Sequence, residues 1–171
     1  MLRALPLSAS LAKMDAIGAP PSSPLAIALG LAVTLAAPRA FAAGPSCAIA
    51  NVTPMVFATY HSGQSLPLDS DGEIDVTCST ARSLQIVLGR SATGRESPRE
   101  MTFGPFLLAY NLFMDAARTI IWGDGAEGTQ IYLGTTTLGQ TLRLPIFGRV
   151  FPLQGLPAGT YIDRIAVTVI F

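Results

Sequence analysis

The sequence has little of what catalytic and metal-binding proteins commonly use. Its 171 residues include one histidine and two cysteines, only 13% are charged, and the single lysine is Lys13. A zinc site takes about four ligands, most often cysteine and histidine, so no metal site is expected. Because no lysine follows residue 13, lysine Schiff-base chemistry and a phosphate-binding P-loop are excluded for the rest of the chain.

An excess of positive charge is also absent. Lys and Arg together number 11, as do Asp and Glu, so the formal net charge is zero. Nucleic-acid-binding surfaces are basic, and we therefore expect no nucleic acid partner. Half of the residues are hydrophobic, which is too many for an intrinsically disordered chain. The length fits one domain around one core.

No hydrophobic run is long enough to span a membrane. The longest, residues 25–36, has about a dozen residues, whereas a spanning helix needs about 20. Arg3 and Lys13 precede it, and Ala40-Phe41-Ala42 follows it with the small-residue pattern of a cleavage site. We interpret residues 1–42 as a signal peptide and residues 43–171 as the exported domain. Met14 is an alternative translation start, and an uncleaved membrane anchor is the competing interpretation.

Cys47 and Cys78 are the only cysteines. Export places them in an oxidising compartment, where a disulfide is the default for such a pair. A disulfide that closes the loop between these two cysteines stabilises a domain by about 3 to 4 kcal/mol on the chain-entropy model. A metal site or a catalytic thiol lacks partner residues.

The apolar residues beyond position 43 alternate with a period of two, and Gly, Pro, Asn and Asp interrupt them. This pattern predicts an all-β sandwich. Strands are expected at residues 47–53, 55–60, 73–79, 83–89, 106–114, 118–122, 129–133, 140–150 and 160–171. Turns are expected at Ser62-Gly63, Asp71-Gly72, Gly123-Asp124-Gly125 and Pro157-Ala158-Gly159.

The segment 160–171 is the longest apolar strand near the C-terminus. One face carries Tyr161, Ile165, Val167, Val169 and Phe171. No sequence follows that could supply a neighbouring strand, and an unpaired apolar edge invites pairing with another chain. The alternative is a central strand flanked on both sides by strands of the same chain.

A set of motifs in order resembles the spore coat protein U domain. They are Tyr110-Asn111-Leu112-Phe113, Asp115-Ala116-Ala117-Arg118-Thr119, Trp122-Gly123-Asp124-Gly125, Phe147-Gly148-Arg149, Pro157-Ala158-Gly159-Thr160-Tyr161 and Val167-Thr168-Val169-Ile170-Phe171. Cys47 and Val76-Thr77-Cys78-Ser79 fit the same pattern. The resemblance extends over nearly all of residues 47–171. It implies an incomplete immunoglobulin-like β-sandwich that lacks its final strand.

The resemblance also implies a function, because the family is similar to subunits of archaic chaperone-usher pili. The expected partners are a periplasmic pilus chaperone, an outer-membrane usher and neighbouring pilus subunits, one of which donates a strand. The donor-strand and chaperone interface would be formed by Tyr161, Ile165, Val167, Val169 and Phe171. The chain would pass through the periplasm to a cell-surface fimbrium, or be secreted, and would support adhesion and biofilm formation. No enzymatic activity and no cofactor are expected.

Two features depart from the family. Phe57-Ala58-Thr59-Tyr60 has Ala58 where the family usually has glycine, and alanine tolerates a positive φ poorly. Only residues 43–46 precede Cys47 after the expected cleavage, whereas a donated strand needs about ten residues. We therefore expect a subunit that accepts a strand rather than donates one, at a fibre tip or as a minor or coat component.

Other residues give weaker signals. His61 is expected to be a solvated loop residue rather than a general base. The acidic stretch 69–75 lacks the glycine and glutamate positions of a calcium loop and is expected to lead into a charged hairpin. Trp122 is expected in a turn, half-buried, and Asp115 and Arg118 could pair across a turn. The alternative function is a self-sufficient secreted coat or ligand-binding module.

Overall fold

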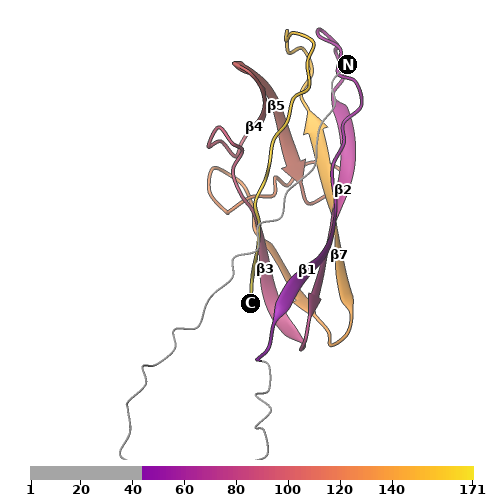
Figure 1. The fold of residues 1–171 in the computed structure, drawn as a ribbon, viewed down its shortest axis with the longest axis vertical. Coiled ribbons are helices and arrows are strands. Elements are labelled where there is room, and N and C mark those ends of the chain that lie inside the picture. The colour runs from indigo at the N-terminus through magenta and orange to yellow at the C-terminus, as the bar shows by residue number, and fades with distance from the viewer. Residues whose placement is uncertain (1–43) are drawn as a thin grey trace, which may run out of the picture. The chain divides into compact units, whose positions relative to one another are not determined.

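The computed structural model describes residues 44–171, and the predicted signal peptide lies outside this range. In these residues the regular secondary structure consists of β-strands (Figure 1). The strands are β1 (Cys47–Thr53), β2 (Leu68–Cys78), β3 (Arg82–Leu88), β4 (Arg99–Phe103), β5 (Phe106–Phe113), β6 (Tyr132–Thr136), β7 (Thr141–Val150) and β8 (Val167–Ile170).

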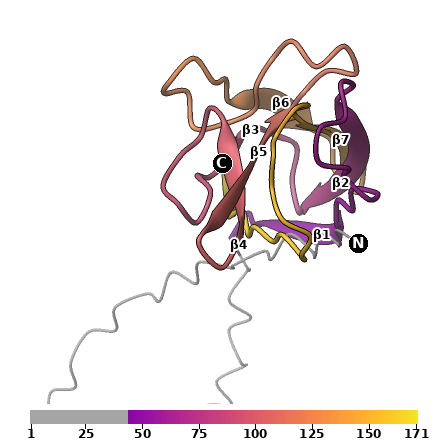
Figure 2. The same cartoon turned by 90° about the horizontal axis from the view of Figure 1, so that it is seen from above.

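The strands form two antiparallel sheets. The larger has the order β1-β2-β7-β5-β4, and the smaller has the order β6-β3-β8. Viewed from above, the strands surround a common interior (Figure 2). Alternate side chains fill it, as shown by Ile74 and Val76 of β2 and Ile86 and Leu88 of β3, all with 0% exposure. The period of two in the sequence therefore sets which face of each strand is buried. The predicted immunoglobulin-like sandwich is confirmed.

Strand β2 is longer than predicted. It begins at Leu68, and Asp71-Gly72 lies inside it rather than in a turn. Gly72 pairs with Ile146 of β7, and a Cβ at this position would lie 3.0 Å from the carbonyl oxygen of Thr53. Because β2 has partners on both sides, β1 and β7, the backbone pairing outweighs the turn preference of Asp-Gly.

Two predicted strands are absent within residues 44–171. Residues 55–60 bury Met55, Phe57 and Tyr60 without forming a backbone ladder. Residues 118–122 make only isolated bridges, and Arg118 at their start has a positive φ of 59°. Strand β4 was not predicted, and β6 begins later than the strand predicted at 129–133.

The predicted strand at 160–171 is reduced to β8, and its first half crosses between the sheets. Ile162 pairs with Thr102 of β4, with N···O distances of 2.9 and 3.1 Å, whereas Ala166 accepts a hydrogen bond from Gly89, next to β3. Between them, the Asp163 carboxylate accepts hydrogen bonds from the Ala92 amide at 3.0 Å and the Tyr110 hydroxyl at 2.7 Å. These side-chain contacts replace a ladder and explain why the strand is short.

Residues 44–171 contain no helix that is long and apolar enough to cross a membrane.

Candidate functional site

The candidate site is the space between the two sheet edges formed by β1 and β8. Within residues 44–171, strand β1 pairs only with β2, and β8 pairs only with β3. The two strands approach each other, yet no backbone hydrogen bond joins them anywhere in residues 44–171. In Figure 1 the yellow C-terminal segment ends beside β3 and β1. Each strand therefore keeps one edge of N–H and C=O groups available for a further strand.

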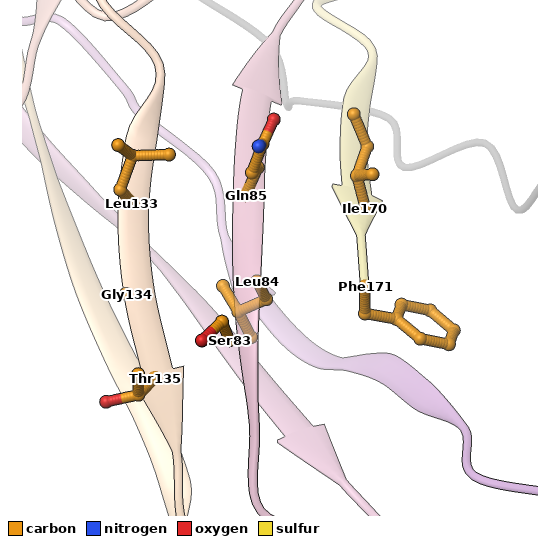
Figure 3. Close-up of a pocket in the computed structure, with 8 residues that line it drawn as sticks. All are labelled: Ser83, Leu84, Gln85, Leu133, Gly134, Thr135, Ile170 and Phe171. Atoms are coloured by element: carbon orange, nitrogen blue, oxygen red, sulfur yellow. The ribbon is translucent and has the colours of Figure 1, made fainter.

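The inward face of the C-terminal segment becomes exposed toward the end of the chain. Tyr161, Ile165 and Val167 have exposed fractions of 1%, 2% and 4%. Val169 is half-buried and Phe171 is 53% exposed, although both lie on the same face. Figure 3 shows the Phe171 ring pointing away from β3, toward the side of β8 that has no partner. The core is therefore covered at one end of this segment and open at the other.

Strand β1 shows the same incomplete burial from the opposite side. Cys47 and Ile49 face the core and pack against it, but both are only half-buried. The inward-facing residues of the central strand β3 from Leu84 onward are 0 to 3% exposed. Half-buried apolar side chains therefore gather on the two edges that face each other, which we call the β1–β8 gap.

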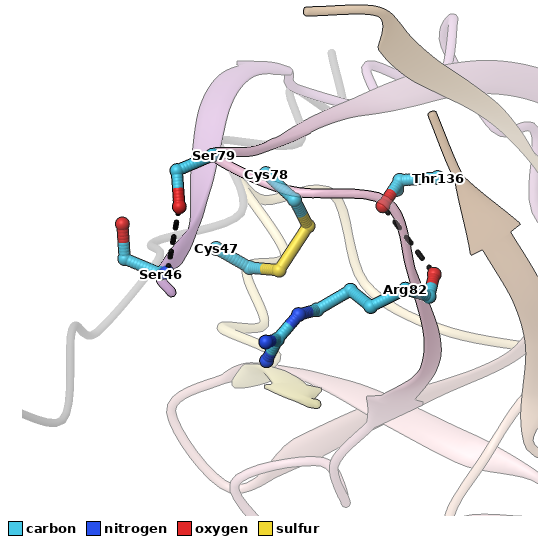
Figure 4. The surroundings of a disulfide bond; sticks show 6 residues. All are labelled: Ser46, Cys47, Cys78, Ser79, Arg82 and Thr136. Atoms are coloured by element: carbon cyan, nitrogen blue, oxygen red, sulfur yellow. Dashed lines mark hydrogen bonds between the residues drawn. A yellow bond between two sulfur atoms is a disulfide. The ribbon is translucent and has the colours of Figure 1, made fainter. Parts of the chain in front are cut away.

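The Cys47–Cys78 disulfide fixes one wall of this gap. It joins the first residue of β1 to the last residue of β2, with a Cα–Cα distance of 4.1 Å. Ser46 and Ser79 add two hydrogen bonds of 2.9 Å just outside it, one of which is drawn in Figure 4. Because β1 has a strand neighbour on one side only among the described strands, this covalent link holds an otherwise weakly secured edge in register.

A buried ion pair, which the sequence analysis missed, holds the opposite end of β3. Glu96 and Arg99 are both 0% exposed, and their side chains lie 3.4 Å apart. The Arg99 guanidinium also donates to the carbonyl oxygens of Leu88, Gly89 and Trp122. Burial lowers the pKa of Arg99 and raises the pKa of Glu96. The sequence pattern did not indicate that these charged residues are buried, because Arg99 is the first residue of β4, a strand that was not predicted.

Trp122 belongs to the same cluster and is 1% exposed, rather than half-buried as predicted. Its indole nitrogen donates to the carbonyl oxygen of Ile86 at 2.9 Å. The backbone amide of Asp124, in the same motif, donates to the Glu96 carboxylate at 2.7 Å. The Trp122-Gly123-Asp124-Gly125 motif is therefore a structural anchor between loop and core, with no aromatic face free for a ligand.

The weaker candidates from the sequence do not form sites. His61 lies with Ser62 and Leu156 along a cavity of about 480 Å³, and no acidic side chain lines it. The acidic residues of 69–75 share the outward face of β2, spread along the strand, and Asp71 and Asp69 there pair with Arg118 and Arg149. No metal-binding cluster occurs in the part of the chain that the structure describes.

Asp115 and Arg118 are joined by a backbone hydrogen bond of 2.9 Å, but their side chains form no ion pair within residues 44–171. The Asp115 carboxylate accepts hydrogen bonds from the backbone amides of Thr119 and Ile120, and the Ile120 bond lowers the pKa of Asp115. Arg118 reaches instead to Asp71 of β2 at 2.9 Å. Because backbone amides of the turn already bond to the Asp115 carboxylate, its oxygens are not available to the Arg118 guanidinium.

The match to a family model decides the family. The model of the Spore Coat Protein U domain matches residues 32–168. This chain belongs to the spore coat protein U domain family. The curated Protein U of Myxococcus xanthus is 29% identical to it over 128 residues, which cover 67% of this chain and 70% of that protein.

Among solved structures, the chain is similar to one in the CsuC–CsuE chaperone–tip adhesion subunit pre-assembly complex from the archaic chaperone-usher Csu pili of Acinetobacter baumannii. The TM-score is 0.49 at 20% sequence identity, and the match covers 74% of this chain and 40% of that chain. This spore coat protein U family member thus spans less than half of the solved chain.

The departure at Ala58 has no structural consequence, because Ala58 does not adopt a positive φ. The family's glycine is therefore not required by the backbone of this member at that position.

Proposed function

We propose that this spore coat protein U family member is a structural subunit of a chaperone-usher surface pilus. In this role it accepts a strand from a neighbouring subunit in the β1–β8 gap. The observation that carries the proposal is that, among the residues the structure describes, both walls of the gap have unpaired backbone edges and half-buried apolar side chains. Family membership supports it, because the family resembles subunits of such pili.

An inserted strand would satisfy two needs at once. Its backbone would hydrogen-bond to the free edges of β1 and β8, and its alternate side chains would cover Ile49, Val169 and Phe171. Each apolar side chain that becomes fully buried contributes about 1.5 to 3 kcal/mol before ordering costs. The donor-strand interface is therefore centred on Val169 and Phe171, while Tyr161, Ile165 and Val167 support it from within the core.

A chaperone would occupy the same gap during transit through the periplasm, and an outer-membrane usher would exchange it for the next subunit. The assembled fibre would lie at the cell surface and support adhesion and biofilm formation. The chain acts in this scheme by binding and has no catalytic step.

The test is to produce the chain alone, with its pilus chaperone, or with a synthetic donor peptide, in an oxidising compartment. The proposal predicts aggregation or degradation of the chain alone and a soluble complex with either partner. A peptide of the same composition in scrambled order is the control, because it lacks the alternation that the gap requires. A stable monomer that binds neither the chaperone nor the donor peptide would establish the alternative, a self-sufficient secreted module.

A further inference from the structure

Arg82 is a charged residue on the inward face of a core strand. It is the first residue of β3, and it shares its face with Leu84, Ile86 and Leu88, which are 0 to 3% exposed. An arginine at such a position is unusual, since charged side chains enter a sandwich interior only where a partner or solvent receives them. Arg82 itself is half-buried, at the open end of the core.

The side chain of Arg82 extends into the β1–β8 gap. Figure 4 shows it alongside the Cys47–Cys78 disulfide, which closes the end of β1. Its guanidinium carbon lies 5.1 Å from the centre of the Phe171 ring, beyond the end of β8. Arg82 therefore touches the walls of the gap at the end where burial is least complete.

Around the gap, the part of the chain that the structure describes offers no opposite charge to Arg82. Strands β1, β3 and β8 contain no other charged residue. No acidic side chain of residues 44–171 forms an ion pair with Arg82, and its Nε is buried without a hydrogen-bond acceptor. A buried donor without an acceptor is costly, and a further strand over the gap would remove more water from the guanidinium.

We propose that Arg82 selects an inserted strand that carries a carboxylate at the position facing it. The occupant is an extended segment of a partner subunit whose inward residues are apolar except for one Asp or Glu at the end nearest Phe171. The carboxylate would accept the unpaired N–H groups of Arg82 in a charge-assisted hydrogen bond. Charge complementarity of this kind discriminates between donor strands of similar apolar content. This inference rests on the proposed function, because it needs a strand in the gap.

The experiment measures the affinity of the full chain, as exported and oxidised, for synthetic donor peptides. Each peptide has about ten residues, alternates Val with Thr, and ends on Glu, Gln or Lys at an inward position. The set is made with this residue at either end, because the direction of an inserted strand is not specified by the gap. We expect the Glu peptide of one orientation to bind about tenfold more tightly than its Gln form, a difference of about 1.4 kcal/mol.

Variants of the chain locate the effect. In Arg82→Met the preference for Glu over Gln should disappear, and in Arg82→Glu the Lys peptide should bind best. Arg143→Met is the matched control, because Arg143 lies on β7 with a 72% exposed side chain and should leave the preference unchanged. The wild-type peptide series is informative even where an Arg82 variant folds poorly.

The outcomes separate the two proposals. If all three peptides bind the wild-type chain equally well, Arg82 does not select a carboxylate and this inference is wrong, while strand acceptance stands. If no alternating peptide binds, strand acceptance itself fails and this inference fails with it.

Discussion

The guanidinium of Arg99 donates a hydrogen bond to the backbone carbonyl oxygen of Trp122 across 2.9 Å, deep inside the sandwich. The two residues are far apart in sequence and both are essentially inaccessible to water. Arg99 thereby connects β4 to the loop that carries Trp122, and through the Leu88 carbonyl oxygen it also contacts β3. The cluster joins the two sheets at the end away from the β1–β8 gap.

Replacing Arg99 with methionine should destabilise the domain by about 3 to 5 kcal/mol, because Glu96 would lose its buried partner and three backbone carbonyl oxygens would lose their donor. Urea unfolding of the oxidised chain with donor peptide bound measures this. Arg95→Met is the control, since the Arg95 side chain is 57% exposed and its pair with Glu100 is long, at 3.8 Å. Similar midpoints for the two variants would show that the buried pair is not important for stability.

The buried carboxyl of Glu96 should make stability depend on pH. Burial raises the pKa of Glu96 above the ordinary value of 4.5. The folded state therefore binds more protons than the unfolded state, so the contribution of Glu96 is greatest at low pH and declines as pH rises above 4.5.

The variant Glu96→Gln removes this titration and nearly preserves the shape of the side chain. The free energy of unfolding of the wild type minus that of Glu96→Gln should decrease between about pH 4.5 and pH 7. Unfolding curves at several pH values check this. A constant or rising difference contradicts the prediction.

Loss of the disulfide should weaken the domain substantially. The bridge spans a sequence separation of 31 residues, and opening it is expected to cost about 3 to 4 kcal/mol. The double variant Cys47→Ser, Cys78→Ser should show this loss in denaturant unfolding and should accumulate less after export. The reduced wild type is the control and should behave in the same way. An unchanged unfolding midpoint would show that the disulfide does not stabilise the domain.

The two faces of β8 should respond differently to charge. Val167 is 4% exposed and faces the core, whereas its neighbour Thr168 faces outward. Val167→Asp would bury an unpaired charge and should abolish accumulation of the subunit even when the chaperone is present. Thr168→Asp places the same charge in solvent and should accumulate normally.

Val169→Asp should fold better than Val167→Asp, because Val169 is only half-buried, but it should not retain a donor peptide. Peptide binding measured by pull-down distinguishes the two variants. Equal loss of accumulation at both positions would mean that the core is closed at Val169 as well.

The alternating pattern of the sequence was sufficient to predict the sandwich and most of its strands. β1, β5 and β7 lie within about a residue of the predicted bounds, because period-two burial determines which side chains face a core. The pattern failed at residues 55–60, whose apolar side chains fill the core from an irregular segment. Alternation reports burial, and backbone pairing is a separate property that depends on neighbouring strands.

That the inward face of 160–171 receives a strand stays a prediction, whereas the burial of its residues follows from the structure. The five residues on the inward face of 160–171 lie on one side of the C-terminal segment, but only Val169 and Phe171 are left uncovered. The position of Asp163 and the crossing from β4 to β3 determine which of these residues are buried. They depend on contacts with Tyr110 and Thr102, respectively, which are distant in sequence.

The sequence by itself determined the fold class, the cysteine pair and the apolar face of the last strand, because composition and period are local properties of the chain. Only the tertiary structure decided that β1 and β8 face each other with free edges, that Arg82 projects between them, and that Glu96 and Arg99 share a buried site. Those arrangements arise from contacts between distant segments, and the free energy of such contacts depends on which strands become neighbours in the folded sheets.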